Sequence, residues 1–209
     1  AMFMRPVFDA ARARPMRVIY AEGEDERVLR AVQTVLDEGL ARPTLIGRPQ
    51  VIAARVRRAG LRFRPGEDVP VVDPDNDPRF REYWTEYHGL MNRRGVTPDM
   101  AKAQIRRSTT TIGAIAVRRG EADAMICGMV GRFDSHLENV RDVIGPARVG
   151  GTFATLNALM LPGQTIFVAD TFVNDDPTAE DDGDREDCPH DGDSADGTDT
   201  TDSTTDSSS

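Results

Sequence analysis

Two glycines and a few polar residues follow a short apolar run, Ala124–Cys127, in the middle of the chain. The candidate ligand-binding residues are Gly128, Gly131, Arg132, Asp134 and Ser135. Glycine lets a backbone come close to a ligand, and the free N–H groups at a helix start favour an anion. Because ligands of open α/β sheets bind at the carboxyl ends of strands, we predict an anion-binding turn here. Arg132 is its predicted cationic contact.

The same turn also has a purely structural interpretation. Every connection from a strand to a helix needs turn residues and a cap, and Ser135 followed by Glu138 is the pattern of a capping box. The spacing matches neither GxGxxG nor GxxxxGK[ST]. The turn alone therefore does not identify a reaction, and we assign no catalytic residue.

The rest of the chain alternates between predicted strands and helices. The strands are Arg17–Ala21, Pro43–Ile46, Val69–Val72, Ala124–Cys127 and Thr165–Ala169. The helices are Val28–Leu36, which Gly39 closes, Pro49–Ala59, Arg79–Arg94, Asp99–Arg119, Ser135–Ile144 and a short one around Phe153–Met160. This alternation predicts an α/β fold with a mostly parallel sheet and helices on both faces. The unbroken apolar run Ala124–Cys127 is expected to be covered on both faces.

An aromatic stripe lies on the helix predicted for Arg79–Arg94, with residues that recur at helical spacing. Its members are Phe80, Tyr83, Trp84, Tyr87, Leu90 and Met91. A stripe of this spacing is typical of a core-facing helix, and we do not interpret it as a platform for stacking nucleotides. We expect no nucleic acid partner.

The acidic residues are concentrated at the end of the chain. The formal net charge is −9 over 209 residues. From Asp175 onward there are 14 acidic residues and one basic residue, Arg185, so this segment carries −13 and the 174 residues before it carry +4. With almost no apolar residue, the segment cannot offset its ordering entropy, and we expect a solvated, disordered tail. Its acidic runs lack the ligand order of a calcium loop, and Cys188 with His190 is too small a set for zinc, so no metal site is predicted.

Two cysteines, Cys127 and Cys188, provide no disulfide framework and suit a reducing cytosol. No apolar run approaches the roughly 18 residues of a membrane span. We expect a soluble cytoplasmic protein with no membrane partner.

Several motifs, in chain order, resemble one family. They are RVIYAEGEDERVLRAV (Arg17–Val32), PTLIG (Pro43–Gly47), GVTPDMA (Gly95–Ala101), IGAIAVRRGEADAMICGMVGR (Ile112–Arg132) and FVADTFVNDDPTAE (Phe167–Glu180). Together they resemble the phosphate acetyltransferase domain, in the version fused at the C-terminus of large bacterial NADP-dependent malic enzymes. The match covers about the first half of that domain.

The resemblance implies a three-layer αβα sandwich of the isocitrate/isopropylmalate dehydrogenase type, here truncated. We expect an entry segment at residues 1–15, a first αβα subdomain at 16–150, an incomplete start of the second at 151–180, and the acidic tail at 181–209. In the family a long helix follows the motif found at Pro177–Glu180. The tail is therefore expected to be an out-of-frame or unrelated end.

The family reaction passes an acetyl group between phosphate and coenzyme A, and it needs cations to hold the phosphate charge. The resemblance implies that the family's base lies in the half that is not matched. It also implies that two arginines of the active transferases fall at Met91 and Glu138. A methionine cannot pair with phosphate, and a carboxylate repels it.

Three classes of function are therefore weighed. The favoured one is an acetyl-CoA-sensing regulatory and homo-oligomerisation module of an NADP-dependent malic enzyme, with CoA or acetyl-CoA as ligand. NADP and a divalent metal are then expected only in the malic enzyme part. The alternatives are an acyltransferase that moves acetyl between phosphate and CoA, and an inactive truncated gene product.

Overall fold

The computed structural model describes residues 4–146, 151, 153–161, 164–170 and 173–174. Contacts between Cα atoms divide the chain into two units, Ala1–Gly151 and Thr152–Ser209. Each unit is described by itself. The predicted acidic tail lies outside the described residues.

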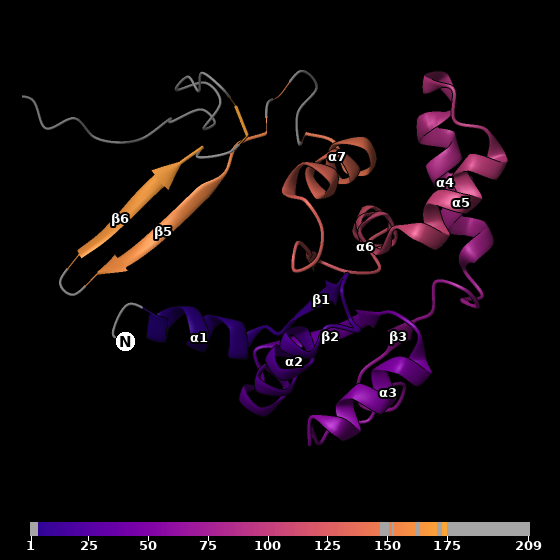
Figure 1. Ribbon diagram of the computed structural model, residues 1–209. Coiled ribbons are helices and arrows are strands. Elements are labelled where there is room, and N and C mark those ends of the chain that lie inside the picture. Colours follow the sequence, from indigo (N-terminus) through magenta and orange to yellow (C-terminus); the bar gives the residue numbers. More distant parts are fainter. Residues whose placement is uncertain (1–3, 147–150, 152, 162–163, 171–172, 175–209) are drawn as a thin grey trace, which may run out of the picture. The chain divides into compact units, whose positions relative to one another are not determined.

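The first unit is built on a parallel sheet (Figure 1). Its strands are β1 (Met16–Tyr20), β2 (Ala41–Ile46), β3 (Val71–Val72) and β4 (Ala124–Ile126). Their order is β3-β2-β1-β4, and every pairing is parallel. The predicted mostly parallel sheet is confirmed.

Helices cover both faces of this sheet. The helices of this unit are α1 (Met4–Ala13), α2 (Glu26–Glu38), α3 (Pro49–Arg58), α4 (Phe80–Met91), the 3-10 helix η1 (Asn92–Arg94), α5 (Pro98–Arg107), α6 (Thr109–Arg118) and α7 (Phe133–Val143). Of these, α1 buries no residue and contributes to neither face. Side chains of β1 alternate between the two faces, so Tyr20 packs with α2 and α3, whereas Ile19 packs with α4 to α7. Two hydrophobic cores flanking one sheet give the predicted three-layer αβα arrangement.

The aromatic stripe lies in the second of these cores. Tyr83, Tyr87 and Met91 are buried on α4, as the spacing predicts. Phe80 and Trp84 are partly buried against the same cluster.

One predicted helix, Asp99–Arg119, is wrong. The chain forms α5 and α6 instead, and it leaves helical geometry at Ser108, with φ −119° and ψ 101°. The Ser108 hydroxyl accepts a hydrogen bond from the Thr111 backbone N–H at 3.1 Å, so Ser108 caps a new helix. A serine followed by three threonines competes with a continuous helix, because hydroxyls bind nearby backbone groups and β-branched residues are poor helix formers.

The predicted strand Ala124–Cys127 exists as β4, but it is not covered on both faces. Ala124 and Ile126 are exposed. The reason is its position, because β4 is the last strand of the described sheet. An unbroken apolar run therefore does not distinguish a central strand from one at the edge.

The second unit contains an antiparallel hairpin of β5 (Leu156–Leu161) and β6 (Gln164–Ala169). The strand predicted at Thr165–Ala169 is confirmed as β6. The short helix predicted around Phe153–Met160 is wrong, because β5 occupies that segment. Leucine, alanine and methionine favour helices locally, but pairing with β6 overrides that preference.

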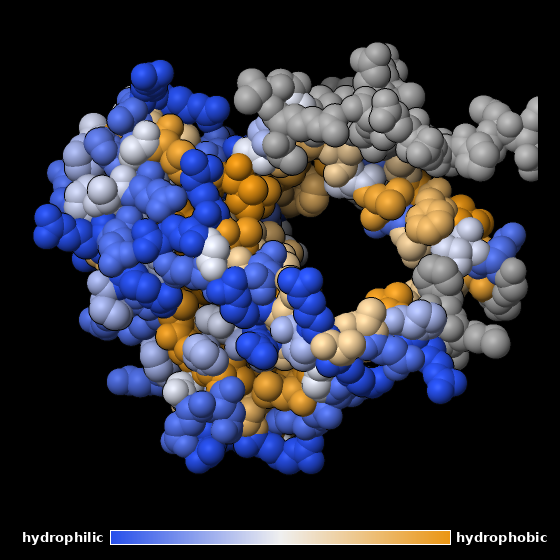
Figure 2. All heavy atoms as spheres, turned by 180° about the vertical axis from the view of Figure 1, so that it is seen from behind, coloured by the Kyte–Doolittle hydropathy of each residue, from blue (hydrophilic) through white to orange (hydrophobic). Residues whose placement is uncertain are grey.

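The hairpin exposes an unusual amount of apolar surface (Figure 2). Leu156, Leu159 and Phe167 are exposed by 67%, 50% and 60%. An isolated hairpin is only marginally stable, and a large apolar surface promotes association. We therefore expect the purified chain to bind the dye ANS strongly and to self-associate.

Changing Leu159 and Phe167 together to lysine should remove most of the ANS signal and shift the chain towards monomer in light scattering. Met100→Lys is the matched control, since Met100 is 54% exposed on α5 and belongs to the first unit. An unmodified chain that is monomeric and silent towards ANS would contradict this expectation.

Candidate functional site

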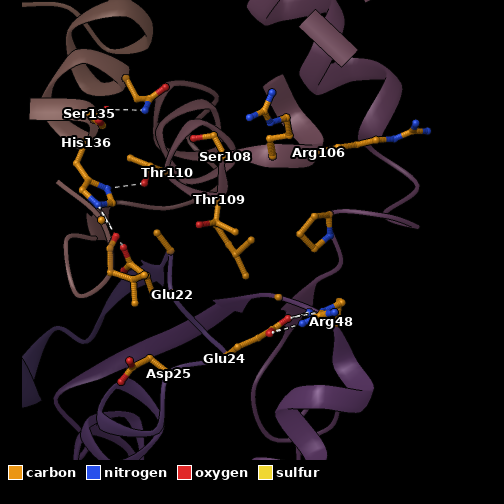
Figure 3. A pocket seen from close by; sticks show the side chains of 18 of the residues that line it. Glu22, Glu24, Asp25, Arg48, Arg106, Ser108, Thr109, Thr110, Ser135 and His136 are labelled. Carbon is orange, nitrogen blue, oxygen red and sulfur yellow. Dashed lines mark hydrogen bonds and ion pairs between the residues drawn. The ribbon is translucent and has the colours of Figure 1, made fainter. Parts of the chain in front are cut away.

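A cavity of about 630 Å³ lies in the first unit (Figure 3). It is lined by the loops that follow β1, β2 and β3, by the junction between α5 and α6, and by the turn that leads into α7. All three loops leave the carboxyl ends of parallel strands, where such sheets bind ligands. The volume falls in the range of small-molecule sites.

The five predicted ligand-binding residues divide into two groups. Gly131, Arg132 and Ser135 line the cavity, whereas Gly128 and Asp134 do not. The Gly128 backbone N–H donates to Glu22 Oε1 at 2.9 Å. Asp134 accepts from Arg132 Nη2 at 3.1 Å, and both side chains are highly exposed.

The glycines of the turn are needed for its shape. Gly128 and Gly131 have φ values of 105° and 106°, which side-chain-bearing residues rarely adopt. Arg27 Nη2 also donates to the Met129 carbonyl at 3.2 Å. Hydrogen bonds from the chain itself therefore hold the turn in place.

His136 joins the turn to the start of α6. Its Nε2 lies 2.8 Å from the Val130 carbonyl oxygen, and its Nδ1 lies 2.8 Å from Thr110 Oγ1. A carbonyl only accepts, so in the neutral ring Nε2 carries the proton and Nδ1 accepts from the threonine hydroxyl. Both ring nitrogens are thereby occupied.

The predicted capping box is wrong. Helix α7 begins at Phe133, with Arg132 at the N-cap and no side-chain cap bond. Ser135 is already inside the first turn, where its carbonyl accepts from Asn139 Nδ2 at 2.6 Å. Gly131 turns the chain into the helix so that the N-cap is Arg132, three residues before the N-cap that the capping pattern predicts. Glu138 is exposed on α7.

Two carboxylates at the cavity are fixed by arginines. Arg48 binds Glu24 through Nε and Nη2, each at 2.8 Å, and Arg27 binds Asp25 in the same bidentate manner at 3.0 and 2.8 Å. The Arg48 hydrogen bonds lower the pKa of Glu24 despite its partial burial. Those of Arg27 lower the pKa of Asp25 to about 2. Both groups are therefore ionised and weakly basic at neutral pH.

Sequence reasoning missed the junction between α5 and α6. Arg106–Thr110 lines the cavity, although the sequence placed these residues within one helix. A signal existed, because serine favours the N-cap position and Ser108 directly follows two arginines, a residue type that favours a helix end. The charged residues that follow the first predicted strand are also part of the site, since Glu22, Glu24 and Asp25 line the cavity.

Among the residues that the structure describes, no group of three or more histidine, cysteine, aspartate or glutamate residues could hold a metal ion. Within the same residues, no helix has the length and apolar character to cross a membrane.

Comparison with known proteins gives consistent matches. The family model described as phosphate acetyl/butaryl transferase matches residues 2–184. The chain is 50% identical over 179 residues to an NADP-dependent malic enzyme of Escherichia coli K12, covering 86% of this chain and 24% of that protein. It is 52% identical over 178 residues to an NAD-dependent malic enzyme of Rhizobium meliloti, covering 85% of this chain and 23% of that protein.

Among solved structures, the EutD phosphotransacetylase of Staphylococcus aureus superposes with a TM-score of 0.72 at 16% identity, covering 83% of this chain and 51% of that one. This likeness concerns the fold alone. The chain spans about a quarter of the length of the malic enzymes it matches.

Proposed function

The chain belongs to the phosphate acetyl/butaryl transferase family, and on this premise we propose that it is an acetyl-CoA-sensing regulatory and oligomerisation domain of a cytoplasmic NADP-dependent malic enzyme. The observation that carries the proposal is the 50% identity to a malic enzyme over 179 residues. NADP and a divalent metal then belong to the malic enzyme part. CoA or acetyl-CoA is the ligand of this domain.

The chemistry of the cavity supports ligand binding over proton transfer. A general base works best with a pKa near the operating pH. The pKa values of Glu24 and Asp25 are lowered, which makes both groups weak bases. His136 uses both ring nitrogens within the protein.

The two positions that the family resemblance aligns with arginines also support binding without transfer. Met91 is only 7% exposed and packs in the core at the end of α4. Glu138 is exposed on α7 and adds a negative charge. Neither residue supplies a cation for phosphate, which a phosphate acetyltransferase needs.

Arg132 is the cation proposed to contact acetyl-CoA at the turn. Its ion pair with Asp134 is exposed at both side chains, and such pairs contribute little, so a phosphate can replace the carboxylate. Arg132→Ala should weaken acetyl-CoA binding about tenfold, the loss expected for one charge-assisted contact. Isothermal titration calorimetry on the 209-residue chain measures this.

Arg93→Ala is the matched control, because Arg93 is exposed on η1 and does not line the cavity. Equal affinity of the Arg132→Ala variant and the unmodified chain would move the ligand away from this turn. Thioester formation from acetyl phosphate and CoA, abolished by Arg132→Ala, would favour the acyltransferase alternative. A chain that neither binds acetyl-CoA nor forms the thioester would favour the third hypothesis, an inactive truncated gene product.

A further inference from the structure

Five arginines line the cavity: Arg48, Arg55, Arg106, Arg107 and Arg132. The guanidinium groups of three of them already have an acceptor within the chain. Arg48 forms the bidentate pair with Glu24, and Arg55 Nη1 donates to the Glu24 carbonyl. Arg132 pairs with Asp134.

The other two arginines end α5. The Arg106 guanidinium lies 4.8 Å from the centroid of the Phe80 ring, which holds it by a cation–π contact. Within the part of the chain that the structure describes, no hydrogen bond, ion pair or ring contact engages the Arg107 side chain. Arg107 therefore places a positive charge at the cavity wall that no carboxylate of the described chain neutralises, whereas the Arg106 guanidinium is directed to Phe80.

Hydroxyl groups stand beside this charge. Ser108 follows Arg107 directly, and Thr109 begins α6 at the same wall (Figure 3). Among the described residues, no hydrogen bond engages the Thr109 hydroxyl. The cavity thus presents a guanidinium and a hydroxyl donor next to one another.

Hydrogen bonds hold the junction of α5 and α6 against α7. Gln104 Nε2 donates to Thr111 Oγ1 and to Asn139 Oδ1, each at 3.0 Å, which ties α5 to α6 and α7. Thr110 is bound to His136 of α7 at 2.8 Å. The backbone that carries Arg107 and Thr109 is therefore held in place before a ligand binds.

We propose that the junction of α5 and α6 is a phosphate-binding subsite of the cavity, with Arg107 as its principal cation and Thr109 as a hydroxyl donor. A guanidinium presents paired N–H donors that fit the oxygens of a phosphate group. The inference rests on the proposed function, since it gives the phosphates of a CoA-type ligand a second anchor besides Arg132. The ligand then extends from the turn before α7 to this junction.

The test uses the 209-residue chain, with CoA, 3′-dephospho-CoA and inorganic pyrophosphate as probes in calorimetric titrations. Arg107→Gln should weaken CoA and pyrophosphate binding about tenfold, as expected for the loss of one charge-assisted contact to phosphate. Arg57→Gln removes the same charge from an exposed position in the last turn of α3, outside the cavity, and should change neither affinity. Circular dichroism verifies that each variant is folded.

The probes separate this proposal from the proposed function. If CoA binding depends on Arg132 and is unchanged in Arg107→Gln, the subsite is wrong while the CoA-sensing role stands. If pyrophosphate binds through Arg107 and CoA does not bind, the subsite stands and the CoA role fails. No binding of any probe to the unmodified chain would overturn both. A loss in Arg107→Gln that is equal for CoA and 3′-dephospho-CoA assigns the diphosphate to the subsite, and a loss for CoA alone assigns the 3′-phosphate.

Discussion

Gly23→Ala should destabilise the first unit by about 3 kcal/mol, because the added methyl group would overpack a rigid site and break a backbone hydrogen bond. A Cβ at Gly23 would lie 2.6 Å from the carbonyl oxygen of Ile46 and 2.9 Å from the Cβ of Leu45. The Gly23 N–H donates to that same carbonyl at 3.0 Å. Since the obstacle is the backbone of β2, no side-chain rotation can relieve it.

Trp84 offers a specific readout of this prediction, because it is the only tryptophan and it lies on α4 of the first unit. Urea unfolding followed by its fluorescence should show the transition of Gly23→Ala at a lower urea concentration. Gly89→Ala is the matched control, since Gly89 lies inside α4 and a Cβ there meets nothing within 4 Å. That substitution should stabilise the unit by about 0.5–1 kcal/mol.

A transition of Gly23→Ala that coincides with that of the unmodified chain would show that the loop after β1 can move away from β2. The loop after β1 also places Glu22, Glu24 and Asp25 at the cavity. Because Gly23→Ala displaces this loop, we expect the variant to lose affinity for acetyl-CoA together with stability. The two losses arise from one displacement of the loop.

The sequence predicts the layered fold well, because hydrophobic periodicity and turn residues determine helices and strands through positions close together in the chain. The helix that Gly39 closes is an example: Val28, Leu29 and Val32 are buried on one face of α2, and Gly39 adopts a φ of 65°. Such features depend on neighbours a few residues away. They can be identified without knowledge of the tertiary structure.

The errors occur where distant contacts decide the outcome. β5 is a strand only because β6 pairs with it, and the exposed face of β4 follows from its place at the end of the sheet. For the candidate site, periodicity placed Gly131, Arg132 and Ser135 after a strand. It could not show that Arg107 lies at the same cavity, since the tertiary fold brings the end of α5 to it.

The cavity also shows why net charge is a poor guide to this chain. The whole sequence carries −9, yet Arg107 at the end of α5 lines the cavity without a carboxylate partner in the described chain. Binding of an anion depends on such local charge, because salt screens more distant charges over about 10 Å. An acidic protein can therefore bind a polyanionic ligand at this wall.

A cluster of hydrogen bonds and ion pairs joins α4 to the residues that follow α6. Its centre is Glu121. One oxygen of Glu121 accepts from the Tyr83 hydroxyl at 2.6 Å and from Arg79 Nη1 at 2.8 Å, and the other accepts from Arg119 Nε at 2.6 Å. Tyr83 is only 1% exposed. Burial, together with its hydrogen bond to Glu121, raises the pKa of the Tyr83 hydroxyl, so this group stays a neutral donor at physiological pH.

Glu121→Ala should therefore cost about 2–3 kcal/mol at pH 7, since it leaves the buried Tyr83 hydroxyl without an acceptor and removes the charge between two arginines. Urea unfolding monitored by Trp84 fluorescence measures the loss. Glu67→Ala is the control, because the pair of Glu67 with Arg64 is exposed at both side chains and such pairs contribute little.

The pH dependence of this loss tests its electrostatic origin. Burial opposes ionisation of Glu121, but the hydrogen bonds of Tyr83 and Arg119 outweigh burial, and the pKa of the folded state lies below the ordinary value. A carboxylate with a lowered pKa stabilises the fold above its unfolded pKa, about 4.3, and the stabilisation is lost as pH falls through the folded pKa. The difference between the unmodified chain and Glu121→Ala should therefore be largest at neutral pH and shrink below about pH 4. A difference that stays constant down to pH 3 would show that Glu121 acts through packing, and the charge between Arg79 and Arg119 would then have no part in holding α6 to α4.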